Sequence, residues 1–392
     1  MLNQFRLSEK VRRGERIGIT AGSRGIKDKP AVLRTIIARL KDLGASPFIV
    51  PCMGSHGNGT AEGQLEVLES LGITEKSMGA PILSSIEVEE IGRTRFGTPV
   101  YADKNMCSAD KIIVVNRIKL HTDFKGEIES GVIKMMVIGM AKPKGALMVH
   151  RLTIKNGFPP VIAEIAPIIL KKLPIFFGMG IIENQFDETA MIELLKPEEM
   201  IEKEKVLLKK ATELMPTLPF DQIDILIIDE MGKNISGAGM DTNVIGRNNF
   251  IAGTKPERPN ITRIFVRDLT EESHGNAAGI GMAEYVTKRL VDKVDLPSTY
   301  LNSITGMIPD NARIPIAFEK DREALSIAHY NSGVFDPEDL RIAWIKNTLH
   351  LEHLYASKAL FEEARSNPRL EILGEPFDFP FDKNGNLVSK WE

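Results

Sequence analysis

The sequence predicts an α/β protein with two doubly wound α/β domains and an active site in the cleft between them. Short apolar runs rich in β-branched residues alternate with helix-like segments in both halves of the chain. A length of 392 residues also exceeds what one ordinary hydrophobic core accommodates. We therefore expect an N-terminal α/β domain at 1–218, a C-terminal α/β domain at 219–375, and a tail at 376–392 that packs back on the N-terminal domain.

The first segment of the chain predicts a right-handed βαβ unit. Residues 16–21 (RIGITA) and 47–50 are apolar enough for two buried strands. Pro30 suits the first turn of the helix between them, and Gly44 suits the position just after its last residue.

The same alternation continues through the rest of the N-terminal half. The predicted elements, in chain order, are a helix capped by Thr60 and ended by Gly72, two short strands within 85–101, a buried parallel strand at 111–115, a helix at 159–172, a strand at 175–182 and a charged amphipathic helix at 197–215. Pro216 and Pro219 follow that last helix and mark the domain boundary.

The C-terminal half predicts a second strand-and-helix unit. Its expected elements are strands at 223–229, 262–267 and 342–345, a helix that begins near Ala277 and a helix at 356–364. Two polar, glycine-rich loops separate these elements and complete the α/β pattern.

Composition excludes several classes of function. A net charge of −3 leaves no basic surface for nucleic acid. The most apolar stretch, 159–182, contains charges and prolines that prevent it from spanning a membrane, and the N-terminus has no signal-peptide core. Cys52 and Cys107 are too few for an iron–sulfur cluster or a disulfide framework and indicate reduced thiols. We expect a cytoplasmic protein, with a homo-oligomer as an open alternative to a monomer.

Two histidines occupy loops that directly follow predicted strands. His56 follows the strand at 47–50, and His121 follows the strand at 111–115, the edge at which open α/β sheets bind ligands. One such histidine is more often a capping or hydrogen-bonded residue than a catalyst. Two of them on separate loops favour a functional pair.

Lys134 lies in an otherwise apolar helical stretch, SGVIKMMVIGM, and His150 follows at the expected exit of that helix. A lysine on an apolar helix usually extends its ammonium group to water. If it is buried, its pKa falls and it becomes a nucleophile. The segment AKPKG that follows suggests a loop that faces phosphate, although solvated Lys142 and Lys144 fit the pattern equally well.

Two glycine-rich loops give weaker signals. The loop 57–63 (GNGTAEG) resembles a dinucleotide fingerprint, but three residues rather than two precede its last glycine. The loop 231–243 follows a predicted central strand and carries Lys233, Ser236, Asp241 and Asn243, which fit a substrate site and an ordinary surface turn about equally.

Together these residues resemble the nickel-dependent lactate racemase superfamily, from the first strand through the loop at 229–247. Members carry an arginine after the first strand, a Gly-Ser/Thr-His loop after the second, a histidine after a later strand, and then a lysine and a final histidine. In this sequence those positions are Arg24, Gly54-Ser55-His56, His121, Lys134 and His150.

The resemblance implies an isomerase, a racemase or epimerase that inverts C2 of a 2-hydroxy acid by hydride transfer to a nickel-pincer nucleotide. This cofactor is a pyridinium bisthiocarboxylic acid mononucleotide that carries nickel. By resemblance, Lys134 attaches it covalently, His150 is the nickel ligand, His56 and His121 are the two bases, and Arg24 contacts cofactor and substrate. Sulfur and imidazole donors suit nickel, and histidine suits proton transfer near neutral pH.

The substrate and the activity have alternatives. Gly131-Val132-Ile133 stands before Lys134 where the lactate enzymes have Gly-Gly-Arg, which argues against lactate itself as the substrate. The polar groups of Lys233, Asp241 and Asn243 suit a longer or more polar hydroxy acid, such as a sugar acid. Lys233 and Asp241 are the expected substrate residues of the second domain. A nicotinamide-dependent hydroxyacid dehydrogenase and a non-catalytic protein that binds the cofactor remain the two alternative functions.

Overall fold

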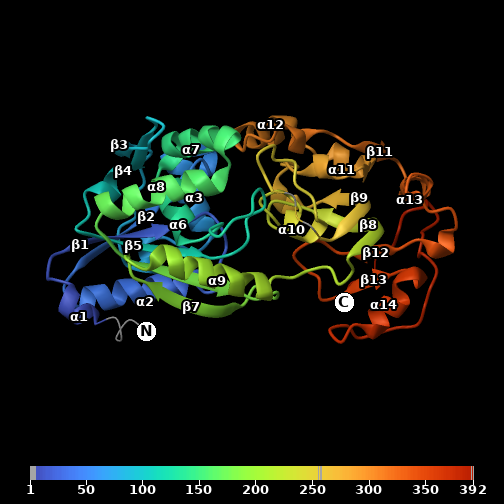
Figure 1. Cartoon of the computed structure of the whole chain (residues 1–392), viewed down its shortest axis with the longest axis horizontal. Helices are drawn as coiled ribbons and strands as arrows, with labels where there is room; N and C mark the ends of the chain where they lie inside the picture. Colours follow the sequence, from blue (N-terminus) through green and yellow to red (C-terminus); the bar gives the residue numbers. More distant parts are fainter. Residues whose placement is uncertain (1–5, 255, 257, 390, 392) are drawn as a thin grey trace. The chain divides into compact units, whose positions relative to one another are not determined.

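The computed structural model describes residues 6–254, 256, 258–389 and 391. The chain divides into two compact units, Met1–Met215 and Pro216–Glu392. Each unit contains a mostly parallel sheet with helices packed on it (Figure 1). The predicted α/β class with two sheet-containing domains is therefore confirmed.

Unit 1 is built on a five-stranded sheet of order β2-β1-β5-β6-β7. Its strands are β1 (Arg16–Ala21), β2 (Ser46–Pro51), β5 (Lys111–Arg117), β6 (Ile175–Glu183) and β7 (Thr189–Leu195), and only β7 is antiparallel to its neighbour. The longer helices are α2 (Lys29–Asp42), α3 (Ala61–Ser70), α7 (Lys142–Asn156), α8 (Phe158–Lys172) and α9 (Met200–Leu214). The strands β3 (Val88–Arg93) and β4 (Pro99–Asp103) form a separate hairpin.

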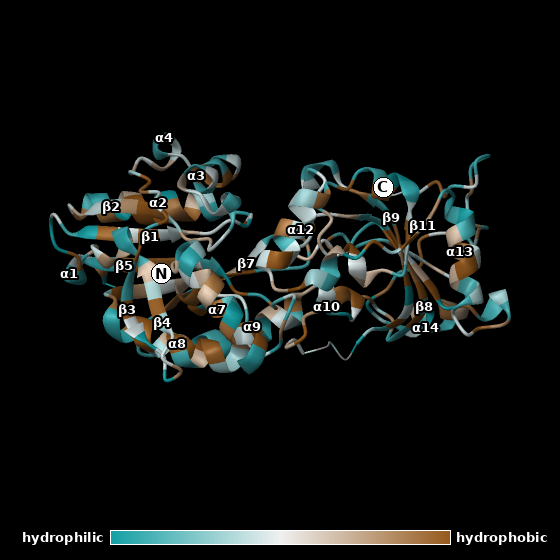
Figure 2. Cartoon of the chain, turned by 90° about the horizontal axis from the view of Figure 1, so that it is seen from above, coloured by the Kyte–Doolittle hydropathy of each residue, from teal (hydrophilic) through white to brown (hydrophobic). Residues whose placement is uncertain are grey.

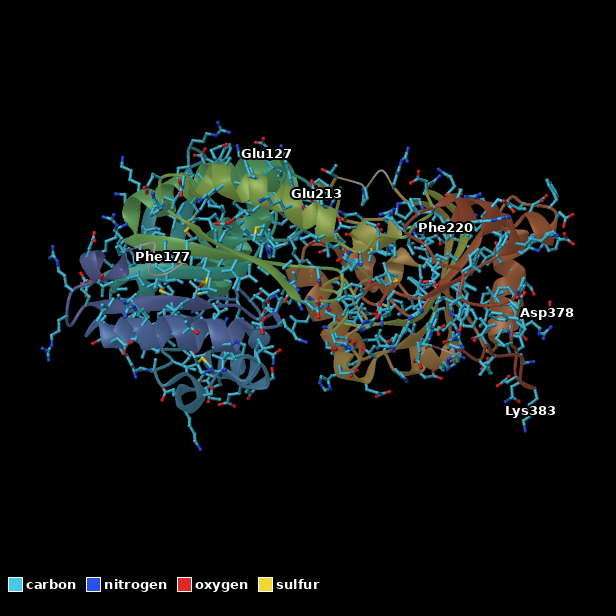
Figure 3. All side chains as sticks on the ribbon, turned by 90° about the horizontal axis from the view of Figure 1, so that it is seen from below. Glu127, Phe177, Glu213, Phe220, Asp378 and Lys383 are labelled. Atoms are coloured by element: carbon cyan, nitrogen blue, oxygen red, sulfur yellow. The ribbon has the colours of Figure 1, made fainter. Side chains whose placement is uncertain are left out.

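The inner strands of this sheet are apolar along their length because helices cover them. Ile19 of β1, Ile113 of β5 and Phe177 of β6 are fully buried in one hydrophobic cluster. Figure 3 labels Phe177 in unit 1 and Glu127 among its exposed residues. Burial of strands in this way is what a parallel sheet requires.

Unit 2 contains a six-stranded sheet of order β11-β10-β9-β8-β12-β13. Its strands are β8 (Gln222–Met231), β9 (Asn260–Leu269), β10 (Tyr285–Thr287), β11 (Ile316–Phe318), β12 (Ile342–Ile345) and β13 (Leu354–Ala356), and only β13 is antiparallel to its neighbour. Its longer helices are α12 (Leu296–Thr305) and α13 (Asp321–Tyr330), alongside the short α11 (Lys288–Asp292) and α14 (Phe361–Ser366). In Figure 2 its inner strands are brown, whereas its outer helices mix brown and teal.

The expectation that residues 376–392 pack back on the N-terminal domain is wrong. Leu387 belongs to a hydrophobic cluster of unit 2, and its carbonyl accepts a hydrogen bond from the guanidinium of Arg267. The indole N–H of Trp391 donates to Asp229 at 2.6 Å. The segment stays with unit 2 because it completes the partners of the buried Arg267–Asp229 ion pair.

Two predicted helices of unit 2 also differ from the structure. The helix expected near Ala277 is a loop with one 3-10 turn, Ile280–Met282. Gly279 there has a φ of +110°, and a Cβ at this position would lie 1.7 Å from the carbonyl oxygen of Ala238. The helix expected at 356–364 begins only after the strand β13.

Other expectations can be set directly against the described residues. The strand at 16–21 and the Thr60 cap are confirmed. Cys52 is buried, Cys107 is partly buried, and both are free thiols. No helix in the described part of the chain is long and apolar enough to cross a membrane.

Candidate active site

The strand order of unit 1 creates a topological switch point between β1 and β5. The chain leaves β1 toward β2 on one side and returns to β5 on the other side. Loops that follow such strands diverge and leave room for a ligand at the carboxyl edge of the sheet. Arg24 lies in the loop after β1, and His121 lies in the loop after β5.

Lys134 closes a single helical turn, α6 (Val132–Lys134), which continues into a π-helical turn, Met135–Gly139. The N–H of Met140 donates to the carbonyl of Met135 at 2.8 Å, the five-residue step of a π-helix. The helix α7 then begins at Lys142, so His150 lies inside a new helix. The prediction of His150 at a helix exit is wrong because Pro143 supports a fresh helix start.

His121 and Lys134 are in direct contact. The backbone N–H of Asp123 donates to Nδ1 of His121 at 3.0 Å, so Nδ1 carries a lone pair and the proton of the neutral ring lies on Nε2. Nε2 faces the Nζ of Lys134 at hydrogen-bond distance. An N–H group can donate only to an amine that has a lone pair. The contact therefore selects the neutral form of Lys134.

The electrostatics of the pair bring the neutral form of Lys134 closer to the physiological pH range. Burial lowers the pKa of Lys134 to about 8, the Asp123 carboxylate opposes the fall, and the positive charge of Arg24 adds to it. Burial and the nearby charge of Lys134 hold the pKa of His121 well below its usual value. At neutral pH the imidazole is thus uncharged, and a nucleophilic fraction of Lys134 is present.

Aromatic contacts bring His150 into the same place. His121 is 8% exposed and stacks on Phe124 with ring centroids 4.4 Å apart. Phe124 stacks in turn on Phe158 at 4.3 Å, and the ring of His150 meets Phe158 edge-on at 6.0 Å. The structure therefore gathers His121, Lys134 and His150 around two phenylalanines that the sequence analysis did not identify.

A buried carboxylate fixes the His121 loop, and it was also missed. The backbone N–H of His121 donates to Glu129 Oε2 at 2.6 Å, and the N–H of Gly126 donates to Oε1 at 3.1 Å. Burial raises the pKa of Glu129. Lys125 also pairs with it at 3.7 Å, but the backbone groups that it holds belong to a folded loop and give no signal in the sequence.

His56 is exposed, but its loop is held from below by a buried amide. The side-chain N–H of Gln64 donates to the carbonyls of Gly54 at 2.9 Å and His56 at 3.3 Å. The ammonium of Lys142, which is fully buried, donates to Gln64 Oε1 at 2.5 Å and to the carbonyl of Pro51 at 2.7 Å. Lys142 therefore neither faces phosphate nor reaches solvent; it ties the start of α7 to the His56 loop.

The glycines of the loop 57–63 have a packing explanation. A Cβ on Gly57 would lie 2.5 Å from the carbonyl carbon of Gly63, and a Cβ on Gly63 would lie 2.2 Å from the carbonyl oxygen of Gly57. The Thr60 hydroxyl accepts the N–H of Gly63 at 3.0 Å and caps α3. The loop thus gives no separate support to a dinucleotide site.

The predicted substrate residues of unit 2 lie in one loop. Lys233 donates to the carbonyl of Gly237 at 2.5 Å. The carboxylate of Asp241 accepts the N–H of Asn243 at 3.0 Å and caps the short helix α10 (Thr242–Ile245). Both side chains therefore help to shape their own loop, and their contact with a substrate stays a prediction.

A single imidazole is the expected protein ligand for nickel. Among the described residues, no group of three or more His, Cys, Asp or Glu side chains is arranged to hold a metal ion. The prediction of His150 as sole ligand requires no such group. An imidazole beside a nucleophilic amine fits a metal whose other donors belong to a covalently held organic group.

The comparison with known families bears directly on this geometry. Residues 2–158 match the family of lactate racemase N-terminal domains, a range that includes Arg24, His56, His121, Lys134 and His150. Unit 1 of the chain therefore contains a domain similar to the lactate racemase N-terminal domains. This domain contains every predicted site residue of unit 1.

Among solved structures, the chain is similar to the lactate racemase apoprotein from Thermoanaerobacterium thermosaccharolyticum. The TM-score is 0.57 at 16% sequence identity, over 88% of this chain and 87% of that chain. At this identity the similarity shows the fold, which is shared across both units. No curated protein matches the sequence significantly.

Proposed function

We propose that this chain is an isomerase of the lactate racemase superfamily that inverts C2 of a small-molecule 2-hydroxy acid and uses a nickel-pincer nucleotide as its cofactor. The family match supports a racemase or epimerase type of activity. The observation that carries the proposal is the contact between Lys134 and His121. It provides a partly buried amine whose neutral form has a lone pair, which is the nucleophile that covalent attachment needs.

The residues of unit 1 divide the work of holding the cofactor. Lys134 would attach it covalently, and His150 would supply an imidazole to its nickel ion. When bound, the cofactor supplies an acceptor for the C2 hydrogen, taken as hydride. Arg24 has a guanidinium that suits a substrate carboxylate or a cofactor anion. Lys233 and Asp241 are the proposed substrate residues of unit 2.

Proton transfer at the substrate hydroxyl falls to His121 and His56. To accept a proton at Nε2, His121 has to carry its ring proton on Nδ1, and the carboxylate of Asp123 lies 3.7 Å from that atom. A Lys134 nitrogen engaged in an amide-type bond has no basic lone pair to accept from Nε2–H. The remaining support for the Nε2–H form is the N–H of Asp123 on Nδ1, which has to yield to the Asp123 carboxylate when the ring proton moves to Nδ1. Covalent attachment at Lys134 would therefore free His121 to act as a base.

The proposed activity is tested with substrate deuterated at C2. We expect inversion with the label retained, because the histidines handle only the hydroxyl proton while the C2 hydrogen never mixes with water. Candidate hydroxy acids, sugar acids included, are incubated with the loaded enzyme, and the product is analysed by chiral chromatography and mass spectrometry. Loss of the label to solvent would point to carbanion chemistry, and accumulation of an oxo acid with reduced nicotinamide would point to a dehydrogenase.

His150→Ala is expected to lose most of its nickel while it retains the adduct on Lys134. One imidazole is proposed to be the only protein donor, so its removal leaves the nickel ion without a protein ligand. Metal analysis and intact mass are measured on protein produced together with the cofactor-synthesis enzymes. His353→Ala, at an exposed position of unit 2, is the control. Full nickel occupancy in the His150 variant would move the metal ligand elsewhere.

A further inference from the structure

The helix α9 places a buried carboxyl group against the turn that carries Lys134. Glu204 is 1% exposed, whereas Glu213 of the same helix is exposed and is labelled in Figure 3. The helices α6 and α9 are in contact, as their neighbouring positions in Figure 1 also indicate. Burial raises the pKa of Glu204 to about 8. Removing a carboxyl group from water costs free energy, so the burial of this acidic side chain requires an explanation.

The carboxyl group of Glu204 serves the first N–H groups of α6. Its Oε2 accepts the N–H of Ile133 at 3.1 Å, and its Oε1 finds no hydrogen-bond partner among the described residues. The N–H of Val132 also interacts with this carboxyl group. A carboxyl group at a helix N-terminus is favoured both by these otherwise unpaired donors and by the helix dipole.

Gly131, the N-cap residue of α6, leaves the space that this carboxyl group occupies. A Cβ at position 131 would lie 2.3 Å from Glu204 Oε1 and 2.5 Å from its Cδ. The usual cap is a Ser, Thr, Asp or Asn side chain of the N-cap residue itself. Here a residue distant in the sequence takes that place, while Asn116 holds the carbonyl of Gly131 from the other side at 2.8 Å.

This turn has little other support. It spans only Val132–Lys134 before the π-helical turn changes the hydrogen-bond ladder. A short turn with an interrupted ladder has few internal bonds to fix its orientation. The direction of the Lys134 side chain, and hence its contact with His121, therefore depends on what holds the first N–H groups.

We propose that Glu204 is a positioning residue for Lys134, a cap supplied by α9 that holds the α6 turn so that the Lys134 amine meets Nε2 of His121. The inference rests on the proposed role of Lys134 as the attachment nucleophile. It extends that role to a residue that contacts the turn carrying Lys134. Gly131 is the partner of Glu204 in this arrangement, because only a residue without Cβ leaves room for the carboxyl group.

The test measures the reactivity of Lys134 in the protein without cofactor. The probe is a small N-hydroxysuccinimide acetate ester, and acetylation of Lys134 is followed by peptide mass spectrometry relative to exposed Lys144 of the same molecule. Glu204→Ala and Gly131→Ala are each expected to slow the acetylation of Lys134 about tenfold, the size of effect that loss of a helix cap produces. Glu204→Gln keeps an acceptor for Ile133 and should stay close to wild type, as should the surface control Glu213→Ala.

The double variant gives the sharpest outcome. In the wild-type background, Gly131→Ala slows acetylation of Lys134 because the added Cβ displaces the carboxyl group of Glu204. The same change should slow acetylation little further when residue 204 is already alanine. Circular dichroism and thermal melting show which variants are folded. If Glu204→Ala does not fold, the contrast between Glu204→Gln and Gly131→Ala decides instead.

Equal Lys134 reactivity in wild type, Glu204→Ala and Gly131→Ala, or additive effects in the double variant, would overturn the positioning role. A failure of the proposed function gives a different result. In that case the cofactor adduct persists in Lys134→Ala, while the dependence of Lys134 acetylation on Glu204 is unchanged.

Discussion

Lys134→Ala is expected to carry no cofactor adduct and to lose all turnover. The amine of Lys134 faces the Nε2 of His121, a contact that its neutral form makes, and burial lowers its pKa to about 8. An alanine at this position removes the nucleophile that covalent attachment needs. Intact mass spectrometry of protein produced with the cofactor-synthesis enzymes measures the adduct directly.

Lys144→Ala is the matched control for this variant. Lys144 lies near the start of α7, is exposed, and places its ammonium over the ring of Tyr101 at 4.4 Å, away from the His121 contact. It should therefore load and turn over like wild type. An adduct of unchanged size on Lys134→Ala would place the covalent bond on another residue.

The lowered pKa of Lys134 also makes the free energy of unfolding depend on pH in a defined direction. The pKa of Lys134 falls from 10.5 in the unfolded chain to about 8 in the fold. Between these values the unfolded chain binds a proton that the folded chain lacks, so the free energy of unfolding of wild type rises with pH in this window. Lys134→Met has no titrating side chain at this position, so this pH dependence is absent from it. Without cofactor, it should melt above wild type at about pH 7, and its advantage should shrink as the pH rises toward about 10.

Local sequence signals were sufficient for the scaffold of unit 1. The strand Arg16–Ala21 is recognisable because both of its faces are apolar, and Gly44 ends the following helix with a φ of +79°. His121 could be placed from the strand before it, since carboxyl ends of parallel strands collect ligand-binding loops. These properties depend on neighbours in the chain, so a sequence contains them directly.

The supports of the site depend on partners far along the chain. Lys142 looked solvated or phosphate-facing because it lies in the Gly-, Pro- and Lys-rich segment AKPKG, yet Gln64 and the carbonyl of Pro51 satisfy its buried ammonium. Glu204 belongs to a helix with many charged residues, and nothing in that helix indicates that one of them caps a turn around Lys134. Such residues become visible only when the fold brings the two segments together.

Replacing His121 by alanine is expected to lower turnover by about two to four orders of magnitude in both directions, the range typical of a lost general base. The histidine acts as base in one direction and as acid in the other, so neither direction escapes. The rates must be divided by the fraction of molecules that carry the adduct, because the contact with Lys134 makes His121 relevant to loading as well. The exposed His353→Ala variant controls for the loss of an imidazole elsewhere.

Asp123→Asn separates the backbone hydrogen bond that Asp123 makes to Nδ1 of His121 from the charge of its carboxylate. The backbone N–H that donates to Nδ1 at 3.0 Å remains in this variant, so loading of Lys134 should proceed. The carboxylate 3.7 Å from Nδ1 is lost, which removes a negative charge that favours the protonated ring. The pKa of His121 should therefore fall further, and the acidic limb of the kcat/KM profile should move to lower pH.

The role of His121 itself would be contradicted by a His121→Ala enzyme that loads fully and turns over like wild type. His56 would then have to account for both proton transfers, and His56→Ala should lose all turnover.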